Sequence, residues 1–143
     1  MIPYRQFNHT ADLGIEVFGG TTVELFTNAA FAVFDLLTEI SLVEKKETRT
    51  IKVEGVDMDD LLANFLREAL YLFNGEQWLA REFTLREFGL EVKRTNKLLA
   101  EVRGEPFDPS RHRIKTELKA VTYHQLGIRK IPEGYTTKVV FDV

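Results

Sequence analysis

The sequence predicts an α+β fold in one domain, residues 1–143, with two main helices packed on a mostly antiparallel or mixed β-sheet. Three observations predict it. Two segments have the spacing of an apolar helical face, roughly seven or eight segments look like strands, and the two kinds do not alternate regularly. The chain of 143 residues, 44% of them hydrophobic, can bury one core, and neither an internal repeat nor a linker-like segment marks a boundary.

The first quarter of the chain reads as two short strands and a helix. Tyr4–Phe7 and Gly14–Phe18 are the strands, joined by the polar crossing Asn8–Asp12. Thr21 or Thr22 can cap a helix that runs to about Thr38, because apolar residues recur on one face after it.

A strand and a second helix follow. Glu47–Gly55 alternates polar and apolar residues, which predicts a strand with one buried face. Acidic residues from Asp57 to Asp60 suit the partial positive charge of a helix N-terminus. A broad apolar stripe then runs to Asn74 and Gly75, which end the helix.

The second half is predicted to be mainly sheet, with the helices covering one face of it. A turn is expected at residues 95–97. The predicted strands are Phe83–Phe88, Leu90–Arg94, Leu98–Arg103, Lys115–Tyr123 and Thr136–Val143.

Composition narrows the function classes. The absence of cysteine excludes disulfides and thiolate metal ligands. Neither a signal-peptide pattern nor an apolar run long enough to cross a membrane is found, so the chain is expected to be cytoplasmic and not membrane-bound. The net charge of -3 disfavours wrapping of nucleic acid by bulk electrostatics, and any RNA is expected to be held by a partner.

Three polar segments could carry chemistry. They are His9–Asp12 between two strands, Lys119–His124 on a strand, and the C-terminal strand that ends in Asp142 and Val143. Each also has an ordinary structural interpretation. Asp12 can serve a turn or cap, Asp142 can be solvated, and Lys119 and His124 can be surface residues. The residues alone leave these alternatives open.

Several kinds of active site find no support in the sequence. Neither a zinc-protease helix motif, an EF-hand loop nor a glycine-rich phosphate loop is present. Serine occurs only at Ser41 and Ser110, which makes nucleophilic hydrolase schemes poor. The basic run Arg111–Arg113 after Pro109 is interpreted as a solvated turn, and the sequence leaves open whether it touches RNA or a partner.

Taken together, the motifs resemble the archease family. The stretch Asn8–Ile15, with its His-Thr-Ala-Asp core, is similar to the opening signature of that family. Lys119–His124 is similar to its second block, the strand ending at Asp142 to its third, and Leu61–Leu70 to its leucine-rich second helix. These features span nearly the whole chain in the expected order. Asn8 departs from the family pattern, which usually has an aspartate there, so a charge role at this position is in doubt.

The resemblance implies a divalent metal site. Its ligands would be Asp12, Asp142 and a backbone carbonyl of Val143. An all-oxygen ligand set suits calcium, the expected ion in isolation, with magnesium or manganese as alternatives. His9, Lys119 and His124 would then lie around the metal without binding it, or face a partner.

The implied function is that of an accessory protein and not an enzyme. Archeases activate an RtcB-type RNA ligase by promoting its guanylylation and repeated turnover during tRNA splicing and RNA repair. RNA would be contacted through the ligase. The alternatives are an autonomous metal-dependent phosphoesterase or nuclease that uses the same carboxylates, and a chaperone-like module.

Overall fold

The computed structural model describes residues 2–9, 12–89 and 95–143. All the strand pairs in these ranges are antiparallel, and the predicted α+β class is confirmed. The helices are α1 (Thr22–Leu37), the short 3₁₀ helix η1 (Ile40–Leu42) and α2 (Met58–Asn74). The strands are β1 (Tyr4–His9), β2 (Asp12–Gly19), β3 (Glu47–Gly55), β4 (Trp78–Gly89), β5 (Asn96–Pro106), β6 (Ala120–Val121), β7 (Arg129–Ile131) and β8 (Gly134–Asp142).

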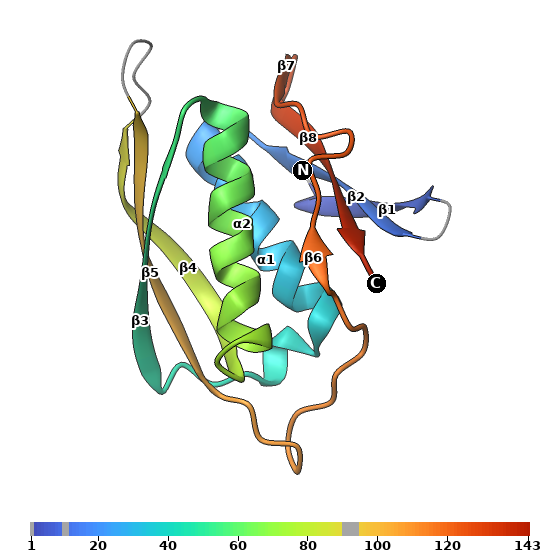
Figure 1. Ribbon diagram of the computed structural model, residues 1–143, viewed down its shortest axis with the longest axis vertical. Coiled ribbons are helices and arrows are strands. Elements are labelled where there is room, and N and C mark those ends of the chain that lie inside the picture. Colours follow the sequence, from blue (N-terminus) through green and yellow to red (C-terminus); the bar gives the residue numbers. More distant parts are fainter. Residues whose placement is uncertain (1, 10–11, 90–94) are drawn as a thin grey trace.

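The strands form two separate sheets with the helices between them (Figure 1). One sheet has the order β1-β2-β8-β6, with β7 paired to β8, and the other has the order β3-β5-β4. Both α1 and α2 contact strands of both sheets. The sequence suggested helices on one face of a sheet, whereas here each helix is covered on two sides. This explains why both helices bury broad apolar surfaces.

Both helices begin at the side-chain caps that the sequence contains. The Thr21 hydroxyl accepts a hydrogen bond from the backbone N–H of Glu24 at 3.1 Å, and the Asp57 carboxylate accepts one from Asp60 at 2.8 Å. Such caps satisfy N–H groups that have no partner within the helix, and each contributes about 1 kcal/mol.

The two strand–helix connections repeat each other closely, although the sequence shows no internal repeat. Corresponding positions lie 36 residues apart, as from 19 to 55 and from 28 to 64. A Cβ on Gly19 would come within 2.6 Å of the Cα of Leu25, and a Cβ on Gly55 within 2.6 Å of the Cα of Leu61. Each strand therefore ends in a glycine because the first turn of the next helix packs directly on its backbone.

Asparagine side chains join the helices to these strands in the same way. The Asn28 amide donates to the carbonyl of Phe18 at 2.7 Å, and the Asn64 amide to the carbonyl of Glu54 at 2.8 Å. We call β2–α1 the first unit and β3–α2 the second unit.

The segmentation differs from the prediction in the second half of the chain. Strand β4 begins at Trp78 and not at Phe83, and β7 was not predicted. Asn96 and Lys97, predicted to lie in a turn, are the first residues of β5. The predicted strand Leu90–Arg94 lies outside the described residues.

The predicted strand Lys115–Tyr123 shrinks to the two residues of β6. The reason is that its backbone finds partners outside a sheet. The N–H of Lys115 donates to Leu37 of α1, and the carbonyl of Leu118 accepts from the Asn74 side chain of α2. An extended segment bonded to helices has no strand ladder on those groups.

One hydrophobic core lies between the two sheets. Both helices and both sheets contribute residues that are fully buried, among them Phe26, Phe65, Trp78 and Phe141. Within the described part of the chain, none of the helices has the length and apolar character needed to cross a membrane.

Candidate metal site

Asp12 and Asp142 lie side by side on neighbouring strands. Strand β2 pairs with β8, and the register ends with Leu13 opposite Phe141. The next residues along the two strands are Asp12 and Asp142, one at the start of β2 and the other at the end of β8. Residues opposite each other in an antiparallel pair have Cβ atoms about 4.5–5.5 Å apart. The fold therefore brings two carboxylates that are far apart in the sequence close together.

The two carboxylates share the face of the sheet that points away from the core. Ile15 and Phe141 are fully buried against the helices, and alternation along a strand turns Asp12 and Asp142 to the other face. Asp142 is exposed and Asp12 is half-buried. A cation can thus reach both side chains from solvent.

Strand β6 lies on the other side of Asp142. Ala120 pairs with Asp142, and the N–H of Lys119 donates to the Asp142 carbonyl at 2.7 Å. The backbone of Asp142 is therefore held in the sheet beside β6. Val143 follows directly and is 45% exposed, so its backbone lies next to Asp142 at the surface.

These residues fit a hard divalent cation. Two side-chain carboxylates and the backbone carbonyl of Val143 would form an all-oxygen donor set, which suits calcium, magnesium or manganese better than zinc. Within the described ranges, three or more His, Cys, Asp or Glu side chains do not gather at any point that could hold a metal. The donor set is therefore small, and such an ion would keep ligand positions for water or for a partner.

The other predicted site residues lie at different distances from this pair. The backbone of His9 pairs with Asp12, so His9 belongs to the same row of the sheet, while its side chain lies outside the described part. Lys119 is exposed and adjoins Asp142 through the backbone. His124 is exposed in a turn four residues beyond Ala120, away from the row of Asp142. Asn8 pairs with Leu13, one row away from Asp12.

Farther along the same sheet face, the charged groups pair with one another. Glu16 is 8% exposed and accepts hydrogen bonds from the Arg5 guanidinium, the shorter at 2.7 Å. Arg129 lies 3.7 Å from the same carboxylate, and the Lys138 ammonium lies 5.3 Å from the centre of the Phe7 ring. These charged side chains therefore contact one another or an aromatic ring, and we assign them a structural role.

The basic run Arg111–Arg113 contains a buried residue that the sequence did not reveal. His112 is 6% exposed, so its interpretation as part of a solvated turn is wrong. Its Nδ1 accepts from the backbone N–H of Asp108 at 2.9 Å, and its Nε2 lies 3.0 Å from the Glu105 carboxylate. This pattern fits a neutral imidazole with its proton on Nε2. The signal in the sequence was an acid at a strand end shortly before Arg-His-Arg.

Glu105 is the centre of this second cluster. Burial alone would raise its pKa, but hydrogen bonds from the Glu44 backbone N–H, Arg111 and His112, together with the charge of Arg111, lower the pKa to about 2. The cluster joins Glu105, near the end of β5, to Arg111 and His112 of the loop after β5, and it does not include the aspartate pair. We interpret it as a support for that loop.

Comparisons with known proteins find relatives over nearly the full length of the chain. The model of the Archease protein family (MTH1598/TM1083) matches residues 4–143. The Pyrococcus abyssi protein archease is 40% identical over 134 residues, which cover 92% of this chain and 91% of that protein. The Pyrococcus furiosus protein archease is 38% identical over 135 residues, with 94% and 93% covered.

Two solved structures have the same fold. The solution structure of Methanobacterium thermoautotrophicum protein 1598 superimposes with a TM-score of 0.83 at 29% identity and covers 99% of both chains. The crystal structure of a Thermotoga maritima archease, described as a possible chaperone, gives a TM-score of 0.58 at 22% identity over 97% of this chain and 96% of its own. At that identity the second likeness concerns the fold alone. On the family match and the full-length relatives, this chain belongs to the archease family.

Proposed function

We propose that this protein binds a divalent cation through Asp12, Asp142 and Val143 and acts as an accessory protein of an RtcB-type RNA ligase. The observation that carries the proposal is the register of β2 and β8, which makes the two aspartates neighbours on an open sheet face. The ligase is proposed as partner because the sequence motifs resemble those of the archease family, and the family match supports that resemblance.

Two carboxylates about 4 Å apart repel by about 4 kcal/mol at an effective dielectric constant near 20. A sequence that places them opposite each other without a cation would lose stability, and a divalent ion offsets this loss. Calcium is the ion expected in the isolated protein, while magnesium and manganese suit the same oxygen ligands.

The accessibility of the pair suits delivery of an ion to another protein. Asp142 and Val143 are exposed at the end of the chain, and a small donor set leaves ligand positions open. The activation step would consist of placing or exchanging a metal ion in the active centre of the ligase, so that guanylylation can repeat. RNA would stay with the ligase, in line with the net charge of -3.

An autonomous phosphoesterase or nuclease is the rival enzyme function. Two-metal hydrolysis needs ions about 3.5–4 Å apart, held by more carboxylates than two. The described residues offer only the aspartate pair at this point of the sheet. Incubation of the purified protein with RNA and manganese tests the rival, because turnover without ligase would support it.

A chaperone-like role is the second alternative, and the Thermotoga maritima relative is described as a possible chaperone. Such a role would depend on apolar surface rather than on two aspartates. Suppression of the aggregation of unrelated proteins, unchanged in Asp12→Ala, would favour this alternative.

The decisive experiment is ligation under multiple turnover with the cognate ligase. We expect wild-type protein to raise the number of turnovers, and Asp12→Ala to abolish this stimulation while the thermal midpoint stays within a few degrees. Glu54→Ala, which removes an exposed strand carboxylate from the other sheet, is the matched control and should stimulate fully. Unchanged stimulation by Asp12→Ala would contradict the proposal.

A further inference from the structure

Strand β6 is the edge strand next to Asp142, and side chains of α2 bind its outer carbonyl groups. The Asn74 amide donates to the carbonyl of Leu118 at 2.8 Å, and the Arg67 guanidinium donates to the carbonyl of Val121 at 3.4 Å. The Leu118 carbonyl lies just before the strand, which is only two residues long, and the Val121 carbonyl belongs to its last residue. Because β6 ends the sheet, the donors of α2 take the place of a further strand.

The inner edge of the same strand holds the end of β8. The N–H of Lys119 donates to the Asp142 carbonyl at 2.7 Å, and the N–H of Thr122 donates to Val140 at 3.0 Å. Strand β6 therefore connects α2 to the backbone of Asp142. A displacement of β6 would break these bonds or carry Asp142 with it.

The guanidinium of Arg67 is itself fixed by neighbours. It lies 4.3 Å from the centre of the Tyr123 ring and donates to the Tyr123 hydroxyl at 3.0 Å. That hydroxyl donates to Asp60 at 2.9 Å. The pKa of Asp60 is lowered, first by the N–H of Val56 and then by Tyr123, so Asp60 stays an acceptor at neutral pH. Arg67 is thus held for its bond to Val121.

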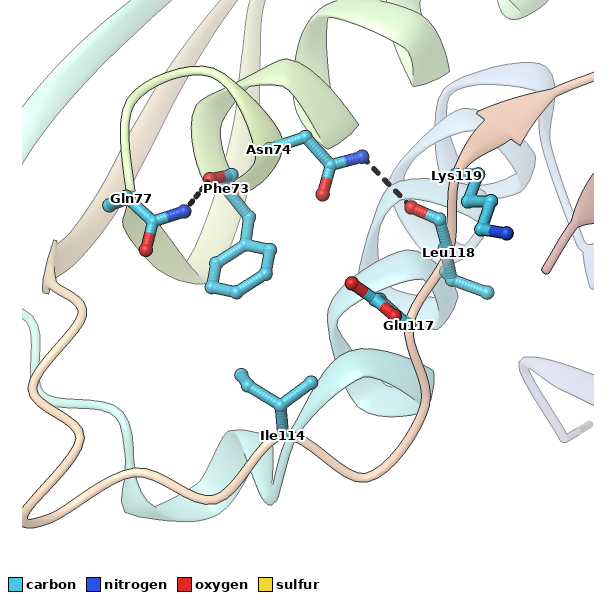
Figure 2. A pocket seen from close by; sticks show the side chains of 7 residues that line it. All are labelled: Phe73, Asn74, Gln77, Ile114, Glu117, Leu118 and Lys119. Carbon is cyan, nitrogen blue, oxygen red and sulfur yellow. Dashed lines mark hydrogen bonds between the residues drawn. The ribbon is translucent and has the colours of Figure 1, made fainter.

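Beside Asn74, the segment that leads into β6 borders an open hollow, although the Leu118 side chain itself is buried in the core. Figure 2 shows the Asn74 amide reaching across to the Leu118 carbonyl at the border of an open hollow of about 660 Å³. Asn74 of α2 and Leu118 and Lys119 before β6 are among the residues that line the hollow. Where part of the space between a helix and a strand is open, polar bonds add to the core packing of Leu118 and Val121 in setting the position of the strand.

We infer that Asn74 and Arg67 are positioning residues that hold β6, and through it the carboxylate of Asp142, in place for metal binding. The consequence for the metal rests on the proposed function, while the consequence for β6 does not. Groups that orient metal ligands from behind typically change the metal affinity about 10- to 100-fold when they are removed.

The first test concerns β6 itself and needs no metal. We expect the double variant Asn74→Ala and Arg67→Ala to raise amide hydrogen exchange at least about tenfold at Lys119 and Thr122, because their bonds to β8 open more often. Exchange at Ile15 in the centre of the same sheet should stay within twofold. Unchanged exchange at Lys119 and Thr122 would overturn the inference, whatever the metal does.

The second test measures calcium affinity by titration calorimetry of the purified proteins. The double variant should bind calcium about tenfold more weakly than wild type. The matched control combines Asn64→Ala, which removes an equal bond from α2 to Glu54, with Arg49→Ala, which removes a guanidinium 5.0 Å from the Trp78 ring. It should lower the thermal midpoint by a similar amount and bind calcium within twofold of wild type.

The outcomes separate the two proposals. Wild-type protein that binds no calcium, with faster exchange in the double variant, would refute the metal site and leave the positioning role of Asn74 and Arg67 standing. Calcium affinity that falls equally in the test and control variants would refute the link from β6 to Asp142, because general destabilisation would then explain the loss.

Discussion

The first and second units share one architecture, but the rows of residues across the sheets at the start of β2 and at the start of β3 differ in charge. In the first unit the row at the start of β2 contains Asp12, Asp142 and Ala120 across β2, β8 and β6. The corresponding row of the second unit, 36 residues later, contains Thr48, Arg103 and Glu82 across β3, β5 and β4. The row of the first unit contains two acidic residues, and the row of the second unit contains one acidic and one basic residue.

The surroundings of Glu82 make the contrast clear. Lys45 lies 2.7 Å from its carboxylate, and that hydrogen bond is the main cause of a lowered Glu82 pKa, with the charge of Arg103 acting in the same direction. In the described ranges the Asp142 carboxylate has no cation within ion-pair distance. The comparison teaches that the scaffold places an acid at this row in both units, and that in the second unit the acid has an internal cation, Lys45.

The largest expected effects test whether the two units really use one architecture. Gly19→Ala and Gly55→Ala should each lower the free energy of unfolding by about 3 kcal/mol or more, because the new Cβ meets helix backbone that cannot move alone. Urea denaturation measures both. Gly89→Ala, where a Cβ meets nothing within 4 Å, is the control and should stay within about 0.5 kcal/mol. A large effect in only one unit would break the comparison.

The next largest effect concerns Glu105, the buried acid that follows the second unit. Glu105→Gln should cost about 2 kcal/mol at pH 7, because the charge-assisted bonds from Arg111 and His112 weaken. The folded pKa of about 2 lies below the ordinary value of 4.5, so the stabilisation is complete above pH 4.5 and is lost between pH 4.5 and 2.

Chemical denaturation of both proteins across this pH range measures the difference. The gap between wild type and Glu105→Gln should be constant from pH 7 to about pH 5 and should close towards pH 2. A gap that shrinks already between pH 7 and 5 would point to a group other than Glu105.

The smallest effects should have opposite signs in the two units. In the presence of a chelator, Asp142→Asn should raise the free energy of unfolding by up to about 1 kcal/mol, because it removes the repulsion with Asp12, which water screens to about this value at an exposed site. Glu82→Gln should lower it by less than about 1 kcal/mol, since exposed ion pairs contribute little. Excess calcium should reverse the sign for Asp142→Asn and leave Glu82→Gln unchanged, which denaturation with and without calcium measures. Equal signs in both buffers would remove the distinction between the two rows.

Much of the local structure could be predicted from the sequence. Thr21 and Asp57 cap the helices as their residue types suggest, and the apolar stripes after them mark buried faces. These features act within one helical turn, so local chemistry decides them. The prediction of a strand at Lys115–Tyr123 was wrong because contacts distant in the sequence decide the structure there. Its alternation resembles a strand, but α1 and α2 compete for its backbone groups.

The candidate site was predictable in part. The motif around Asp12 and the terminal Asp142 could be named from their resemblance to family blocks, whereas His112 was misjudged because its burial depends on Glu105 and on the packing of the loop. The contribution of Arg67 and Asn74 left no mark in the sequence, because both look like ordinary polar positions of a helix.

The sequence by itself determined the two capped helices, the strand alternation, the absence of thiolate chemistry and the presence of an acid at each of two strand ends. Only the tertiary structure decided that the helices lie between two sheets and that β8 pairs with β2 in the register that brings Asp12 beside Asp142. The physical reason is the distance along the sequence between the residues that interact. Caps and helical faces are set by neighbours a few residues away, while a strand register joins segments from opposite ends of the chain and is fixed by the burial of one whole face.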